Sequence, residues 1–109
     1  MKETIQKTFS IKQKDKRLYI LVDKSLSPVY GCVQGGHAVA EYCLKNKVEW
    51  KNEYLIYLYA DVDEWIKRLK EHQIKYTAFR EPDLNNKVTA IACYHQKGRM
   101  LFKSLKLVR

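Results

Sequence analysis

Hydrophobic residues fall in runs along this chain whose lengths and periods predict alternating strands and helices. Residues 18–22 are continuously apolar and bounded by charge, which is typical of a strand that is covered on both faces. Further strands are predicted over residues 54–60, 75–79 and 88–94. Residues 99–109 alternate imperfectly, so they predict either an added edge strand or a short helix.

Two helices are predicted between the first three strands. Ser27 followed by Pro28 suits an N-cap and a first helical position, and the helix is expected to run to about Asn46. Asp61 and Glu64 form an acidic capping pair for the second helix. Helical spacing predicts that the sheet-facing stripes are Val29, Cys32, Val33, Gly36, Ala40, Cys43 and Leu44 in the first helix, and Val62, Trp65, Ile66 and Leu69 in the second.

The order of elements, β-α-β-α-β-β, predicts the fold class. We expect one α/β domain over residues 17–109, built as three layers with a four-stranded mixed sheet flanked by helices. Ligands of such sheets collect at the carboxyl ends of the parallel strands, beside helix N-termini. That rule points to residues 23–37, joined by the turn at residues 80–89.

Charge is distributed unevenly along the 109 residues, which carry a net charge of +9. Residues 1–17 hold six basic and two acidic residues, and residues 95–109 hold five basic and no acidic ones, whereas residues 18–94 are neutral. We therefore expect a basic N-terminal arm, residues 1–16, and a basic tail that hold a phosphate backbone, while the neutral core reads or cleaves its end.

Several classes of protein do not fit the composition. No apolar run approaches the ~18 residues of a membrane span, so we expect a cytoplasmic protein without a membrane partner. The three cysteines lack zinc-type spacing, so we expect no metal site and take them as small core residues in a reducing compartment. The phosphate-cradling glycine motifs are absent, and we expect no cofactor.

The first helix carries a second, polar strip. Tyr30, Gln34, His37 and Glu41 follow helical spacing, and the adjacent Gly35-Gly36 pair suggests that something needs close approach there. A histidine oriented by a neighbouring polar side chain suits proton transfer to or from a ligand. The alternative is a histidine that is merely hydrogen-bonded at a helix surface.

A proline turn, Phe79-Arg-Glu-Pro-Asp83, is the other candidate feature. Pro82 fixes its own φ and restricts Glu81 to extended geometry, so Glu81 and Asp83 are presented in a defined way. Such turns are common in loops. This one gains interest because the predicted topology places it near the start of the first helix.

Three segments carry a resemblance to a known family. With Gln34-Gly-Gly-His-Ala38 on a helix that follows an apolar strand, the chain resembles the type 2 peptidyl-tRNA hydrolases of archaea and eukaryotes, whose first helix carries a G-K-x-x-x-Q-x-x-H-A pattern. Val88-Thr-Ala-Ile-Ala92 resembles the family's last core strand, and Leu105-Lys-Leu107 resembles its closing segment. The resemblance spans roughly residues 17–108 and is greatest to small divergent members from phages and bacteria.

The resemblance implies an enzyme of translation that hydrolyses the ester between a peptide and tRNA, with possible homodimers through the apolar residues of the tail. One departure is that Tyr30 stands where the family has its lysine, and Lys24 reaches the same region only if the preceding loop is rearranged. The residues that the resemblance assigns to catalysis are Gln34, His37, Glu81, Asp83 and Thr89, and those that it assigns to tRNA binding are Lys24, Tyr30, Arg80, Lys103 and Lys106.

Three functions are therefore open. The first is peptidyl-tRNA hydrolysis, with His37 or an acid of Glu81 and Asp83 activating water and Gln34 orienting the substrate. The second is a catalytically inactive tRNA- or RNA-binding module of the same fold, which the missing lysine favours. The third is a small phage-type factor that interacts with a protein partner. A Lys or Arg side chain within reach of Gln34 and His37 would favour the first over the second.

Overall fold

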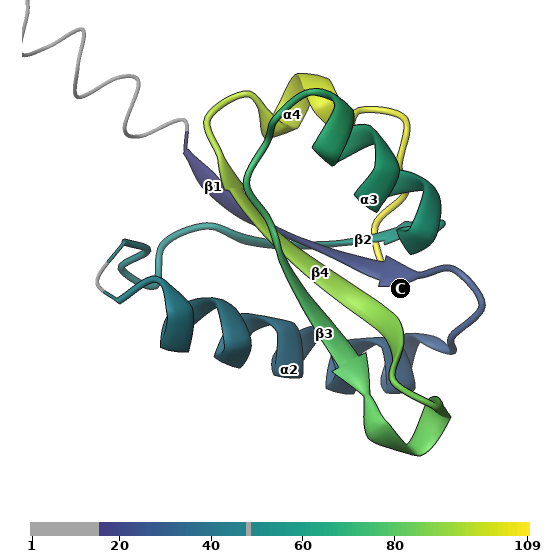
Figure 1. Cartoon of the computed structure of the whole chain (residues 1–109). Helices are drawn as coiled ribbons and strands as arrows, with labels where there is room; N and C mark the ends of the chain where they lie inside the picture. Colours follow the sequence, from purple (N-terminus) through teal and green to yellow (C-terminus); the bar gives the residue numbers. More distant parts are fainter. Residues whose placement is uncertain (1–15, 48) are drawn as a thin grey trace, which may run out of the picture.

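The fold is a mixed sheet between two layers of helices, as Figure 1 shows. The structure, a computed structural model, describes residues 16–47 and 49–109, so the predicted arm lies outside it except for Lys16. The elements are β1 (Arg17–Asp23), α2 (Pro28–Lys45), β2 (Leu55–Ala60), α3 (Val62–Glu71), β3 (Thr77–Glu81), the 3-10 turn η1 (Pro82–Leu84), β4 (Lys87–His95) and α4 (Gly98–Leu101).

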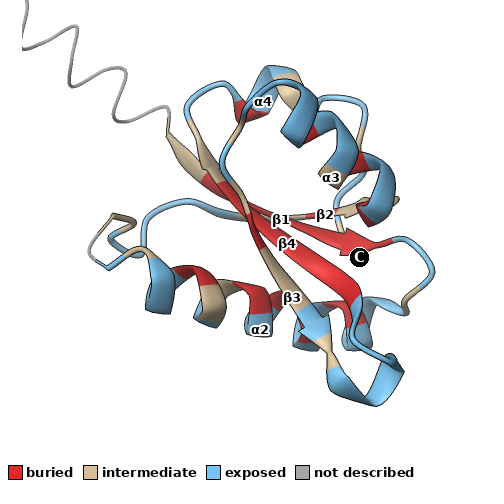
Figure 2. Ribbon diagram, in the orientation of Figure 1, coloured by how far each residue is buried: buried red, intermediate tan, exposed pale blue. Residues whose placement is uncertain are grey.

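The sheet has the strand order β2-β1-β4-β3 and confirms the predicted α/β class. β1 pairs with β2 in parallel, and β4 pairs antiparallel with both β1 and β3. Figure 2 shows that the two central strands, β1 and β4, are the most buried. Their residues from Leu18 to Val22 and from Val88 to Cys93 are buried, because α2 covers one face of the sheet and α3 with α4 the other.

Both predicted helix starts are confirmed. The Ser27 side chain accepts a hydrogen bond from the Tyr30 N–H at 3.3 Å, and Pro28 occupies the first turn, where its missing N–H costs nothing. The Asp61 carboxylate accepts from the Glu64 N–H at 3.2 Å. α3 buries the predicted stripe, with Val62, Trp65 and Leu69 buried and Ile66 packed against the same core.

The prediction for the buried face of α2 is wrong. The helix buries Gly31, Gln34, Gly35, Ala38 and Tyr42. The residues expected to face the sheet lie mostly outside: Val29 is 78% exposed, Val33 51% and Leu44 70%, and Cys32, Gly36, Ala40 and Cys43 are exposed as well.

Side chains of β1 and β2 explain the choice of face. A Cβ at Gly35 would collide with the ring of Tyr57, and one at Gly31 would lie 2.8 Å from Val22 Cγ1. The sheet therefore needs small residues on the helix face that approaches it, whichever stripe is more hydrophobic. The close approach predicted at the Gly35-Gly36 pair occurs at Gly35, where the Tyr57 ring packs against the helix. Gly36 faces open space.

The cysteine prediction holds for one of three residues. All three cysteines are free, and Cys93 is buried, where burial raises the pKa of its thiol to about 12. Cys32 and Cys43 are exposed because they lie on the outer face of α2. The prediction of small core residues is thus confirmed for Cys93 and wrong for the other two.

The tail combines both predicted alternatives. After α4, Phe102 is buried against the rings of Tyr19 and Trp65. The chain then reaches the outer edge of β2, where Leu107 forms an antiparallel bridge with Leu58. Figure 1 shows this last segment in yellow, running from α4 to β2. The tail therefore completes the core of its own domain and adds a minimal edge strand.

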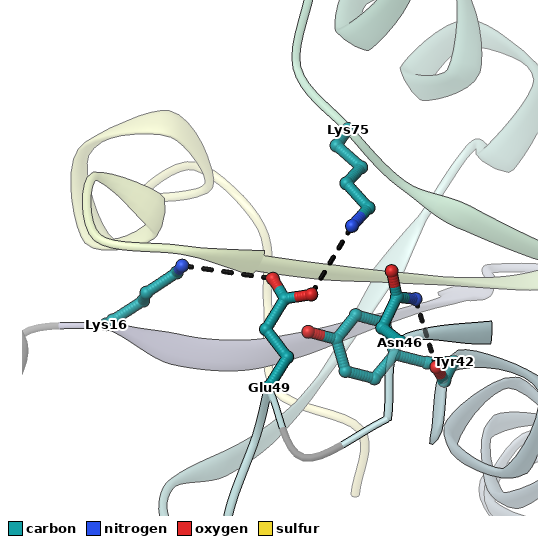
Figure 3. Close-up of polar contacts among 5 residues, drawn as sticks. All are labelled: Lys16, Tyr42, Asn46, Glu49 and Lys75. Atoms are coloured by element: carbon teal, nitrogen blue, oxygen red, sulfur yellow. Dashed lines mark hydrogen bonds and ion pairs between the residues drawn. The ribbon is translucent and has the colours of Figure 1, made fainter. Parts of the chain in front are cut away.

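A charged cluster ties the segment after α2 to two other parts of the chain (Figure 3). The Glu49 carboxylate lies 3.9 Å from Lys16 Nζ and 3.3 Å from Lys75 Nζ. Burial, reinforced by the negative charge of Glu49, raises the pKa of Tyr42. Partly exposed ion pairs of this kind contribute up to about 1 kcal/mol each, so the cluster orients the loop more than it stabilises the fold.

Candidate functional site

A buried polar pair joins α2 to the sheet at the predicted site. Gln34 is 1% exposed and Thr89 is 1% exposed, and the Thr89 hydroxyl donates a hydrogen bond to Gln34 Oε1. A buried polar group without a partner costs about 1–3 kcal/mol, and this bond removes that cost for the Thr89 hydroxyl and for Gln34 Oε1. The structure thus brings together two of the residues that the resemblance assigned to catalysis.

A bulge in β4 turns Thr89 toward α2. Phe79 of β3 pairs with Ala90, and the next residue, Arg80, pairs with Val88, so Thr89 has no partner on β3. Strand alternation is broken there, because Val88 joins the core under α3 while Ala90 joins the core under α2. Such a bulge re-aims one side chain without ending the strand. It is the reason why Thr89 reaches Gln34.

His37 lies beside this pair on the surface of α2. Its ring stacks on the ring of Phe79 with centroids 4.6 Å apart and planes inclined by 14°. His37 is exposed, and in the described part of the chain no hydrogen bond occupies either of its ring nitrogens. The imidazole is therefore stacked on an aromatic neighbour and is accessible to solvent.

The remaining members of the polar strip flank His37. Tyr30 is 37% exposed in the first turn of α2. Glu41 is half-buried one turn beyond His37, and its carboxylate lies 3.9 Å from Lys45 Nζ. Within the predicted strip, Gln34 is therefore buried, whereas the side chains of Tyr30, His37 and Glu41 reach the surface.

The proline turn lies at the same end of the sheet as the start of α2, as Figure 1 shows. Glu81 ends β3 and is half-buried, and Asp83 lies in the exposed turn η1. Asn85 and Asn86 close the turn with positive φ angles of 55° and 60°, which asparagine tolerates better than most residues. Among the described residues, no hydrogen bond or ion pair joins either carboxylate to His37.

The side chains assigned to tRNA binding lie in separate parts of the molecule. Lys24 and Lys106 line one hollow at the carboxyl ends of β1 and β2. Arg80 lies on β3, where its guanidinium donates to the Asn86 carbonyl at 3.3 Å. Lys103 is exposed in the tail. Among residues 16–47 and 49–109, no lysine or arginine donates a hydrogen bond to Gln34 or His37.

One buried carboxylate in this region escaped the sequence analysis. Asp23 ends β1 with 9% exposure, and its Oδ2 accepts from the Ser25 N–H at 3.2 Å and from the Ser25 hydroxyl. The contacts fold the loop between β1 and α2 and so place Ser27 for capping. An aspartate two residues before a serine, directly after an apolar strand, is the signal that indicates such a turn.

Two other kinds of site find no support within the described residues. No group of three or more His, Cys, Asp or Glu side chains is placed there to hold a metal ion. Of the helices in residues 16–47 and 49–109, none has the length and hydrophobicity that crossing a membrane requires.

Comparison with known proteins supports the fold alone. No family model and no curated protein matches the chain. A solved structure that matches is a protein of unknown function, Atu0240, from Agrobacterium tumefaciens strain C58, with a TM-score of 0.64 and 11% sequence identity. The match covers 85% of this chain and 97% of that one. At this identity the likeness establishes a shared three-layer architecture.

Proposed function

We propose that the protein hydrolyses the ester between a peptide and the terminal ribose of tRNA at the surface formed by α2, β3 and the bulge of β4. The observation that carries the proposal is the arrangement of His37: an accessible imidazole stacked on Phe79, beside the buried pair of Gln34 and Thr89. An oriented histidine with a free ring nitrogen is the group that activates water most often in enzymes.

The proposed reaction needs one proton acceptor. A ring nitrogen of His37 takes a proton from water as the water oxygen attacks the ester carbonyl carbon. The tetrahedral intermediate then expels the ribose oxygen, which takes the proton back from the imidazolium. The products are a peptide acid and tRNA with a free terminal hydroxyl. Glu81 or Asp83 would hold the attacking water or the ribose from the adjacent turn.

Gln34 takes a different role from the one the sequence suggested. Because it is buried and its Oε1 accepts from Thr89, we assign it to positioning α2 against β4 rather than to contact with substrate. Thr89→Val keeps the size of the side chain but leaves Gln34 without its partner. We expect it to destabilise the fold by about 1–3 kcal/mol and to lower kcat only partly.

A specific observation favours a second function, RNA binding without turnover. The developing oxyanion needs a positive charge or a pair of donors, and in the described residues no lysine or arginine donates a hydrogen bond to Gln34 or His37. Tyr30 stands at the family's lysine position. A chain that keeps the surface and lacks the cation would hold the end of the tRNA and leave the ester intact.

Release of the blocked amino acid from N-acetyl-aminoacyl-tRNA distinguishes the two functions. We expect turnover by the unchanged chain and a loss of about 10²–10⁴-fold in His37→Asn, the usual contribution of a general base. RNA affinity should stay the same in this variant, and His72→Asn, an exposed histidine after α3, serves as its matched control.

The outcomes separate as follows. Tight tRNA binding with no release by the unchanged chain selects binding without turnover, and gain of activity in Tyr30→Lys would then identify the missing cation as the reason. Turnover that His37→Asn leaves unaltered would refute the proposed site. If the protein shows no turnover and no salt-sensitive RNA binding, both functions are refuted.

A further inference from the structure

A basic hollow lies at the carboxyl ends of β1 and β2, on the opposite edge of the sheet from Phe79. Its volume is about 320 Å³, within the range of small-ligand sites. Tyr59 and Leu105 supply apolar walls, Ser104 supplies a hydroxyl, and Lys24 and Lys106 supply two positive charges. None of the described residues that line it is acidic.

The backbone fixes the two lysines on either side of one strand. The Lys24 N–H donates to the Ala60 carbonyl at 2.9 Å, and the Lys106 carbonyl accepts from the Tyr59 N–H at 2.8 Å. Lys24 therefore belongs to the β1 side of β2, and Lys106 to its outer side. Two strand spacings place their backbones about 10 Å apart, so both ammonium groups can reach one anion between them.

The charge of this hollow is uncompensated within the described part of the chain. The ion pairs found there involve Lys16, Lys45, Arg68 and Lys75, whereas Lys24 and Lys106 make none. Two cations that line one concave surface without a counter-charge repel each other and raise the local concentration of anions. An anionic ligand removes that cost.

Tyr59, in the lining of the hollow, restricts the kind of anion that we expect to bind there. Tyr59 is half-buried, and its ring lies under the first turn of α2, where a Cβ at Gly31 would come within 3.9 Å of its Cε1. Stacking of a base on an aromatic ring contributes about 1–3 kcal/mol per base, so an aromatic side chain in the lining favours an anion that carries a base. A bare phosphate would leave this wall and Leu105 unused.

We propose that this hollow binds a nucleoside monophosphate unit, with the phosphate between Lys24 and Lys106, the base on Tyr59, and Ser104 donating to the phosphate or the ribose. The unit is a free nucleotide or one residue of an RNA strand, since both present the same chemistry. The site goes beyond the proposed hydrolysis, because it uses none of the residues on the His37 surface and requires no ester cleavage.

A titration of the full chain with adenosine monophosphate, followed by backbone amide shifts in NMR, tests the location. We expect the largest shifts at residues 24, 59 and 104–106. Adenosine and inorganic phosphate, titrated separately, should each bind more weakly than the nucleotide because each engages only part of the lining. Shifts confined to another surface, or no binding of the nucleotide at low salt, would overturn the proposal.

A pair of double variants with equal charge separates a built site from general attraction. We expect Lys24→Gln with Lys106→Gln to weaken nucleotide binding about tenfold and to make that binding less sensitive to salt, because two positive charges beside the phosphate are lost. Lys67→Gln with Lys70→Gln, on the exposed side of α3, should change the dissociation constant by less than about twofold. Equal losses in both double variants would overturn the site.

A short single-stranded RNA carried through the same titration identifies the source of the unit. Tighter binding than the monophosphate, with shifts at the same amides, indicates a strand, and equal or weaker binding indicates a free nucleotide. Both results keep the site. Thermal midpoints of the two double variants, expected within a few degrees of the unchanged chain because all four lysines are exposed, exclude unfolding as the cause of any loss.

Discussion

At the scale of single residues, burial determines whether a polar side chain can contact a ligand or only other parts of the protein. Gln34 and Thr89 are buried and bonded to each other, so their contribution is to hold α2 against β4. His37, three residues after Gln34, is exposed and stacked on Phe79, so it meets whatever binds at the surface. One strip of a helix thus supplies both a structural anchor and an exposed imidazole.

His95 gives a pH dependence that belongs to a single residue. Burial lowers its pKa from 6.5, and the positive charges of Lys16 and Lys97 lower it further. Its Nδ1 accepts a hydrogen bond from the Lys97 N–H at 3.0 Å. The unfolded chain therefore takes up the proton at a higher pH than the folded chain does, and protonation favours unfolding.

We expect the stabilising effect of neutral His95 to be fully present above pH 6.5 and to be lost as the pH falls from 6.5 through the lower pKa of the folded state. Urea unfolding between pH 7 and 5 measures it, and His95→Gln should flatten the decline in the free energy of unfolding. His72→Gln serves as the control. An equally steep decline in His95→Gln would show that other groups cause it.

At the scale of elements, α2 shows that small residues select the face that packs on a sheet. Its most hydrophobic side chains lie outward, and its inward face carries Gly31, Gly35 and Ala38. Burial of the outer stripe would gain apolar area, yet the Tyr57 ring and the Val22 side chain leave no room for it. Close packing outweighed hydrophobic periodicity here.

The two neighbouring glycines of α2 make a matched test of this explanation. Gly35→Ala places a methyl group against the ring of Tyr57, whereas Gly36→Ala places one in open space. We expect Gly36→Ala to stabilise the fold by about 0.4–1 kcal/mol through helix propensity, and Gly35→Ala to destabilise it by about 1–3 kcal/mol through overpacking. Chemical denaturation measures both.

The sign of the difference is the decisive result. Equal effects of the two alanines would mean that Tyr57 moves aside without cost, and close packing at Gly35 would not explain the orientation of α2. Gly35→Ala combined with Tyr57→Leu tests the same contact from the strand, because removal of the ring should relieve part of the destabilisation.

At the scale of the whole molecule, the excess charge falls outside the candidate catalytic surface. The neutral segment at residues 18–94 contains His37, Glu81 and Thr89, and the tail brings Lys106 to a hollow that Lys24 also lines, at another edge of the sheet. Under the proposed function, the two regions divide the work between chemistry and holding the phosphate backbone. The arm at residues 1–16 would also help to hold the phosphate backbone.

Removal of residues 1–15 tests the contribution of the arm while leaving Lys16 beside Glu49. The deletion takes away four basic and two acidic residues. We expect weaker RNA binding and a salt slope that falls by at least about 0.7, the contribution of one phosphate contact to a single strand. Thermal stability should stay the same.

A full-length variant with Gln at Lys2, Lys7, Lys12 and Lys14 is the matched control, since it removes the basic charge and keeps the chain. If the charge of the arm is responsible for the effect, this variant should lower the RNA affinity and the salt slope as much as the deletion does. A deletion that leaves both the affinity and the salt slope unaltered would show that the arm takes no part in RNA binding.

Much of the fold could be predicted from the sequence because its signals are local. The apolar run of β1, the Ser27-Pro28 start of α2 and the Asp61 cap of α3 each depend on neighbouring residues. Their order then restricts the topology to a small mixed sheet. The candidate residues Gln34, His37 and Thr89 were also evident, through their resemblance to a family pattern.

Three features were decided only by the tertiary structure. The buried face of α2 depends on the rings of β2, which a helical period does not contain. The approach of Thr89 to Gln34 depends on a bulge opposite Phe79, where pairing with another strand sets the register. The hollow that Lys24 and Lys106 line depends on the tail returning to β2. Each depends on the pairing or packing of segments far apart in the sequence, so local periodicity carries no signal for it.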